Sequence, residues 1–187
     1  MKKLVLTLCA TALMGAFTTL PAIAQDMKPV MVGGASMFPN KDIIDNAVNS
    51  KDHTTLVAAV KAAGLVDTLK SAGPFTVFAP VNDAFAALPA GTVDNLLKPE
   101  NKATLTKVLT YHVVPGRFNA AELSKQIGMG NGRAMLKTAS GGTLVASISG
   151  SDVMITDENG GSAKVTIADV NQSNGVIHVV NKVLLPK

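Results

Sequence analysis

The sequence predicts an α+β fold in which helices come first along the chain and a β-sheet comes last. Apolar residues recur at helical spacing between positions 43 and 112, whereas between positions 144 and 180 they alternate with polar residues or form short β-branched runs. Apolar residues make up 47% of the chain, enough for one hydrophobic core at this length. We therefore expect a single α+β domain.

The N-terminal half begins with a helical pattern over residues 41–70. Two short apolar stripes occur there, and the second follows Asp52 and Thr54, which are candidate helix caps. Residues 75–79 read Phe-Thr-Val-Phe-Ala, a β-prone run closed by Pro80, which has no N–H to donate to a sheet. This half of the chain therefore predicts helices followed by one short strand.

Further helices are predicted after that strand. Apolar residues recur at i, i+3, i+4 and i+7 over residues 81–88, with Asn82 as a candidate N-cap. A longer helix is expected to start near Glu100, to carry His112 on its apolar face and to be ended by Pro115-Gly116. A small helix is expected over 120–127.

The C-terminal third of the chain is predicted to be β-structure. Strands over 153–156 and 164–167 flank Asn159-Gly160-Gly161, residues that favour a hairpin turn. Residues 176–180 are almost entirely apolar, which is typical of a central strand.

The N-terminus has the layout of a secretory signal peptide over residues 1–24. Two lysines precede an apolar run, and small residues precede a cleavage site before Gln25. The apolar run is shorter than the roughly 20 residues of a transmembrane helix. Residues 25–40 have no clear periodicity and predict an N-terminal arm, which leaves 41–187 as the domain. We expect a secreted or periplasmic protein without stable membrane insertion.

Charge and residue types argue against several classes of function. The formal net charge of +4 falls to +2 without the signal peptide, and the chain has no Trp and one Tyr, so nucleic acid is not an expected partner. Cys9 lies in the signal peptide, so no disulfide is expected. The three histidines are far apart in sequence, so no metal site is predicted, and no cofactor motif occurs.

The histidines and the tyrosine favour structural roles. His112 lies on an apolar helix face, which predicts a packed histidine hydrogen-bonded to a neighbouring strand. Tyr111 is expected to bury its ring and keep one hydroxyl partner, and the pair lacks the third, orienting group of a catalytic set. His178 lies on the opposite strand face from Ile177 and Val179 and predicts a hydrogen-bonding residue.

Three segments resemble the fasciclin family. Residues 76–85 (TVFAPVNDAF) are similar to its first signature, and residues 174–180 (NGVIHVV) with 183–186 (VLLP) are similar to its second. Between them, Tyr111-His112 matches the Tyr-His pair of the family. The matches occur in the family's order, and the similarity extends over 42–186.

The resemblance implies a β-sandwich or wedge with several helices packed along one edge, and a non-catalytic role in adhesion to cells or matrix. In animal relatives the Tyr-His region and an Asp-Ile pair are implicated in integrin contact. These positions correspond here to Tyr111, His112, Asp169 and Val170, with Val in place of Ile. No Arg-Gly-Asp tripeptide occurs in the chain.

The main prediction is an exported adhesion protein, not an enzyme, whose partner is a cell-surface or matrix protein or a polysaccharide. The alternative is a periplasmic or secreted carrier of an apolar small molecule or lipid, held between the helices and the sheet, because eight methionines and many alanines favour soft packing. A hydrolase has the least support, since no nucleophile, base and orienting group are found together in the sequence.

Overall fold

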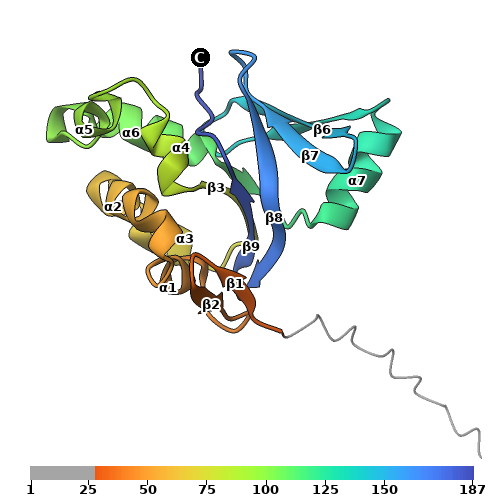
Figure 1. The fold of residues 1–187 in the computed structure, drawn as a ribbon, viewed down its shortest axis with the longest axis horizontal. Helices are drawn as coiled ribbons and strands as arrows, with labels where there is room; N and C mark the ends of the chain where they lie inside the picture. The colour runs from red at the N-terminus through yellow and green to blue at the C-terminus, as the bar shows by residue number, and fades with distance from the viewer. Residues whose placement is uncertain (1–27) are drawn as a thin grey trace, which may run out of the picture.

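The computed structural model describes residues 28–187, so the predicted signal peptide, residues 1–24, lies outside the described residues. Within 28–187, no helix has the length and hydropathy needed to cross a bilayer. In chain order the elements are β1 (Val30–Val32), β2 (Ala35–Met37), α1 (Ile43–Ala47), η1 (Lys51–His53), α2 (Thr54–Ala63), α3 (Val66–Lys70), β3 (Phe75–Pro80), α4 (Asn82–Ala86), α5 (Thr92–Leu96), η2 (Pro99–Asn101), α6 (Lys102–Tyr111), β4 (Val113–Pro115), α7 (Ala120–Met129), β5 (Arg133–Lys137), β6 (Thr143–Ser149), β7 (Asp152–Thr156), β8 (Ser162–Gln172) and β9 (Gly175–Val180). The predicted α+β class, with helices mainly first and strands mainly last, is confirmed (Figure 1).

Seven strands form one mixed sheet in the order β4-β3-β9-β8-β7-β6-β5. β3 and β9 run parallel, and the other neighbouring pairs run antiparallel. The long strand β8 pairs with both β7 and β9 and is irregular between Val165 and Val170. The Ala139 N–H donates to the Val113 carbonyl at 2.7 Å, which draws the two ends of the sheet together. The sheet is therefore a nearly closed wedge, as the resemblance implies.

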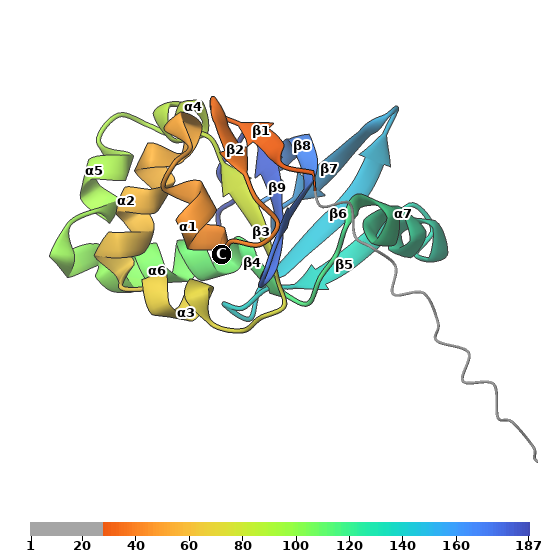
Figure 2. The ribbon, with the colours of Figure 1, turned by 90° about the horizontal axis from the view of Figure 1, so that it is seen from below.

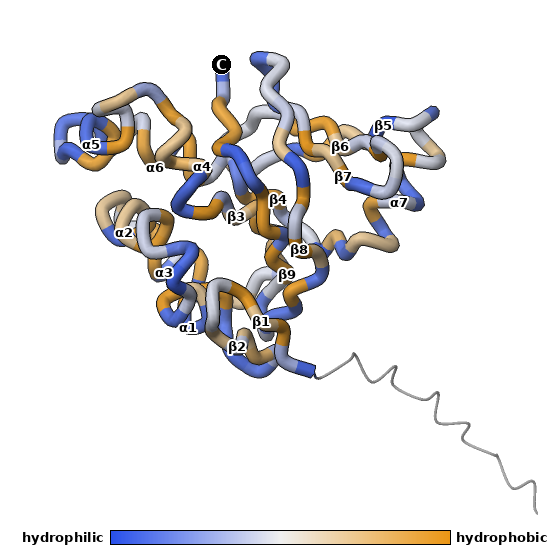
Figure 3. Tube along the Cα trace, in the orientation of Figure 1, coloured by the Kyte–Doolittle hydropathy of each residue, from blue (hydrophilic) through white to orange (hydrophobic). Residues whose placement is uncertain are grey.

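Alternation along the two central strands divides the core into two parts. On β3, Val77 packs toward the helices, whereas Phe78 packs toward the interior of the wedge. On β9, Ile177 likewise packs toward the helices and Val180 toward the interior of the wedge. Figure 2 shows α1 to α6 gathered on one side of the sheet and α7 at its other end, and Figure 3 shows apolar segments of β3, β9 and α2 along this division.

The predicted N-terminal arm contains a β-hairpin that the sequence did not predict. β1 and β2 pair antiparallel, and Val32 and Met37 are buried in the core that lies under the helices. Each strand has three residues, too few for a period of two to be recognised. The side chain of Asn46 in α1 accepts a hydrogen bond from the Phe38 N–H at 2.9 Å, which ties the segment after the hairpin to the first helix.

The predicted helix caps are wrong, and Asn82 explains why. The N-cap of α4 is Val81, so Asn82 already lies inside its own helix. Its side-chain oxygen instead accepts from the Thr55 N–H at 3.0 Å, and its amide donates to the Lys51 carbonyl at 2.8 Å. Asn82 therefore caps α2 from another helix, where neither Asp52 nor Thr54 does.

Candidate functional site

The four residues carried over from the family lie in two separate places. Tyr111 ends α6 and His112 is its C-cap, whereas Asp169 and Val170 lie in the irregular part of β8. Tyr111 and Val170 are fully buried, His112 is 3% exposed, and only Asp169 is half-buried. No hydrogen bond or ion pair between described residues joins one pair to the other. Three of the four side chains therefore face the interior, and the interaction role of the set stays a prediction.

Tyr111 joins α6 to the start of β6 and to the β7–β8 turn. Its hydroxyl donates to the Thr143 carbonyl at 2.9 Å and accepts from the Glu158 N–H at 3.1 Å. The Glu158 carboxylate accepts in turn from the Thr143 N–H at 3.0 Å. A Cβ at Gly142 would lie 2.6 Å from the Tyr111 ring, so only glycine fits beside it. Burial raises the pKa of Tyr111, which keeps the hydroxyl protonated as a donor.

His112 joins α6 to the C-terminal segment, residues 183–187. Its Nδ1 lies 2.8 Å from the Val108 carbonyl and must donate, so Nε2 is the acceptor for the Leu184 N–H at 3.0 Å. Burial lowers the pKa of His112 to about 4, against the smaller opposing effects of the Val108 carbonyl and Asp157. The predicted packed, hydrogen-bonded histidine is confirmed, but its partners are its own helix and the C-terminal segment, not a strand.

Asp157 and Asn159 hold the same C-terminal segment, a role that no pattern in the sequence predicts. Asp157 Oδ2 accepts from the Leu185 N–H at 3.1 Å, while its Oδ1 accepts from the Asn159 and Gly161 N–H groups of the β7–β8 turn. The Asn159 amide donates to the Leu185 carbonyl at 2.8 Å. The turn residues are readable from the sequence, but their partners lie more than 20 residues away.

Asp169 and His178 hold the start of α7. Asp169 has a positive φ of 57°, and its carboxylate accepts from the Ala120 N–H at 2.6 Å. Its own N–H donates to His178 Nδ1 at 3.4 Å, and His178 Nε2 donates to the Phe118 carbonyl at 2.7 Å. Burial lowers the pKa of His178, so the imidazole is neutral at pH 7. The predicted hydrogen-bonding role of His178 is confirmed.

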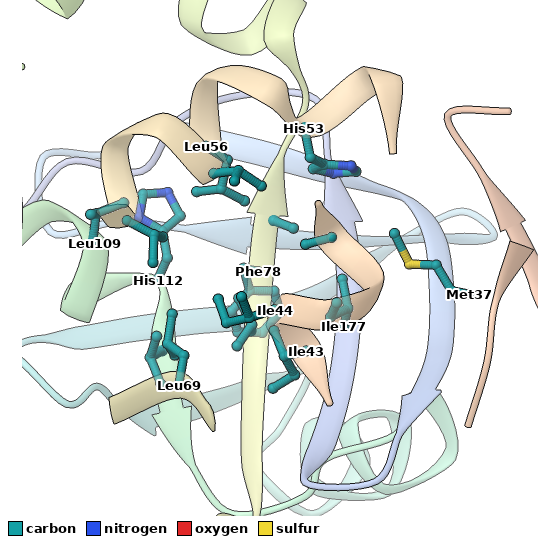
Figure 4. Close-up of a pocket in the computed structure, with 16 residues that line it drawn as sticks. Met37, Ile43, Ile44, His53, Leu56, Leu69, Phe78, Leu109, His112 and Ile177 are labelled. Carbon is teal, nitrogen blue, oxygen red and sulfur yellow. The ribbon is translucent and has the colours of Figure 1, made fainter. Parts of the chain in front are cut away.

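An apolar cavity lies between the helices and the sheet, where the carrier hypothesis expects one (Figure 4). Its volume is about 30 Å³, room for about one water molecule, whereas ligand pockets span roughly 300–1,000 Å³. The lining residues are Met37, Ile43, Ile44, Ala47, His53, Leu56, Val57, Val60, Leu69, Val77, Phe78, Ala79, Leu109, His112, Val113 and Ile177.

His53 is the polar residue on the hairpin side of this cavity. Its Nδ1 pairs with the Ser50 hydroxyl at 2.9 Å, and its Nε2 makes no hydrogen bond of normal geometry to another described residue. Burial lowers the pKa of His53, which the Ala79 carbonyl and Asp52 partly oppose. A neutral imidazole in an apolar setting follows. Within residues 28–187, no three His, Cys, Asp or Glu side chains gather as a metal site would require.

Comparisons with known proteins agree with this architecture. The family model described as "Fasciclin domain" matches residues 51–186. The chain is 44% identical over 181 residues to Protein sll1483 of Synechocystis sp., covering 94% of this chain and 93% of that protein. It is 34% identical over 170 residues to the immunogenic protein MPB70 of Mycobacterium bovis, covering 88% of this chain and 78% of that protein.

Longer relatives contain the same unit as one part. The chain is 36% identical over 148 residues to transforming growth factor-beta-induced protein ig-h3 of Sus scrofa, and spans 20% of its length. The solved FAS1 domain pair of the insect cell adhesion molecule Fasciclin I aligns with a TM-score of 0.70 at 18% identity, over 79% of this chain and 52% of that one. Because the family model covers well over half of its length, this chain belongs to the fasciclin domain family.

Proposed function

We propose that this protein is an exported, non-catalytic adhesion or interaction module that binds a cell-surface or matrix protein or a polysaccharide. The observation that carries the proposal is the use of its chemically active side chains. Both ring nitrogens of His112 and of His178, and the hydroxyl of Tyr111, are engaged with backbone groups inside the fold. These side chains hold segments of the fold together. The proposed function is therefore binding through surface residues.

The proposal includes export and an indirect role for the carried-over residues. The layout of residues 1–24 supports removal of a signal peptide and a secreted or periplasmic location. Tyr111 and His112 hold the β7–β8 turn and the C-terminal segment, and Asp169 holds the start of α7. Loss of one of these anchors would change binding by displacing the exposed segment that it holds.

The test measures adhesion of the mature chain, residues 25–187, to envelope and matrix fractions of its source organism on a biosensor surface. Saturable binding that a fasciclin-free protein of similar size and charge does not show is the expected result. Tyr111→Phe is the suitable variant for testing the indirect role of Tyr111, because the residue is fully buried and the variant keeps its ring. Thermal unfolding of the variant is recorded to show that it is folded. Absence of binding above the control protein would refute the proposed function.

The carrier function remains the second candidate because the cavity has the predicted position and an apolar lining. Its volume of about 30 Å³ requires the helices to move before anything larger than about one water enters. Native mass spectrometry of protein purified from its own host tests this directly. A bound mass that organic extraction removes would favour the carrier, and consistently ligand-free protein would eliminate it.

A further inference from the structure

The end of the wedge near α7 carries the two most exposed methionines of the described chain. Met129 is 69% exposed and Met135 is 77% exposed. Both line an open groove of about 760 Å³, together with Gln126, Gly130, Arg133, Ala134 and Val145. Flexible thioether side chains suit surfaces that adapt to a bound partner, and exposed apolar groups lining a hollow are typical of interaction sites.

The groove is bordered by Arg133, Ala134 and Met135 of β5, the last strand of the sheet. Burial alternates along this strand, so that Arg133, Met135 and Lys137 share the solvent face. Their cross-strand neighbours on β6 are Ser147, Val145 and Thr143, none of which is charged. Among the described residues, neither Arg133 nor Lys137 forms an ion pair. The acidic residue of α7, Glu122, accepts a hydrogen bond from the Gln126 amide. The strand therefore presents an apolar group between two unpaired cations.

We propose that β5 and the α7 groove bind an extended segment of a partner protein that adds a strand to the sheet. Alternate residues of a strand lie about 6.7 Å apart, so an added strand places three successive same-face side chains opposite Arg133, Met135 and Lys137. Charge complementarity then specifies the pattern acidic-x-apolar-x-acidic. This inference rests on the proposed interaction function and names the class of partner.

Two features favour a protein segment over a lipid surface as the occupant. The exposed side chains Arg133, Met135 and Lys137 follow one another at alternate positions of a single strand, a spacing that the side chains of an extended chain match. An end strand also directs unpaired N–H and C=O groups outward, and a second strand satisfies them. The hydrogen bond that draws the two ends of the sheet together is made by the Ala139 N–H, which lies beyond the end of β5. β4 therefore does not pair with β5 itself.

The test is a selection of random peptides of about twelve residues, displayed on phage, against the mature chain. Enriched peptides are expected to contain the acidic-x-apolar-x-acidic pattern and, as synthetic peptides, to bind Met135→Asp and Arg133→Gln at least about tenfold more weakly. Met31→Asp and Lys61→Gln are matched controls, since both residues are exposed and lie outside the groove. All four variants should unfold at the wild-type temperature.

Three results would overturn the inference. They are the absence of enriched peptides, equal binding of enriched peptides to the groove variants, and binding of phosphatidylglycerol vesicles through Met135 without any selected peptide. The adhesion assay on envelope and matrix fractions distinguishes failure of the groove inference from failure of the proposed adhesion function. Wild-type adhesion that Met135→Asp leaves unchanged refutes only the groove, whereas no wild-type adhesion refutes the proposed function.

Discussion

Replacing His112 with Gln should remove a defined part of the pH dependence of stability. In the folded protein Nε2 accepts a hydrogen bond from the Leu184 N–H. Protonation of His112 would turn Nε2 into an N–H donor that faces the Leu184 N–H, so this hydrogen bond would be lost. It would also place a charge in a buried site. The folded state therefore disfavours the proton, and burial holds the pKa of His112 at about 4 instead of 6.5.

The direction and size of the pH effect on stability follow from the difference between the pKa of His112 in the folded and unfolded states. A group whose pKa is lower in the folded state stabilises the fold fully above its unfolded pKa, here 6.5, and loses that contribution as the pH falls toward 4. Between pH 7 and pH 5 the loss amounts to about 2 kcal/mol, and to about 3 kcal/mol below pH 4. In urea unfolding, 2 kcal/mol corresponds to a midpoint shift of about 1 M.

The assay compares urea midpoints of the wild type and His112→Gln at pH 7 and pH 5. Burial also lowers the pKa of His53 and His178, so the variant should keep their share of the acid sensitivity and lose only that of His112. The variant will be less stable at pH 7, since two hydrogen bonds are lost. An equal fall in stability from pH 7 to pH 5 in both proteins would refute the assignment.

Three further changes test the anchors. Tyr111→Phe should lower the free energy of unfolding by about 2 kcal/mol, because the buried Thr143 carbonyl and Glu158 N–H lose their hydroxyl partner, and unchanged denaturant midpoints would contradict this. Asn82→Ala should cost about 1 kcal/mol and speed amide hydrogen exchange in the first turn of α2; faster exchange confined to α4 would instead support the cap that the sequence predicted. Asp169→Ala should destabilise more than Asp169→Asn, since Asn keeps an oxygen for the Ala120 N–H and tolerates the positive φ, and thermal unfolding in the reverse order would show that this bond has no structural role.

Local patterns determined which residues form helices and strands where a segment is long enough to show its period. The α6 helix and the β7–β8 hairpin illustrate this, because each has several apolar residues on one face or a turn of Asn and Gly between two strands. β5 was not predicted, since its solvent face carries Arg133, Met135 and Lys137 and only two of its residues are buried. The hairpin of β1 and β2 was missed because its strands are shorter than a recognisable repeat.

The sequence by itself determined the α+β class, the family, the packed position of His112 and the hydrogen-bonding role of His178. The tertiary structure alone decided the partners of the polar side chains: Asn82 with α2, Tyr111 with Thr143 and Glu158, and His112 with Leu184. The physical reason is that a buried polar atom requires a partner but does not specify which one. That choice depends on which distant backbone groups the packed helices and strands leave within about 3 Å, which no local pattern encodes.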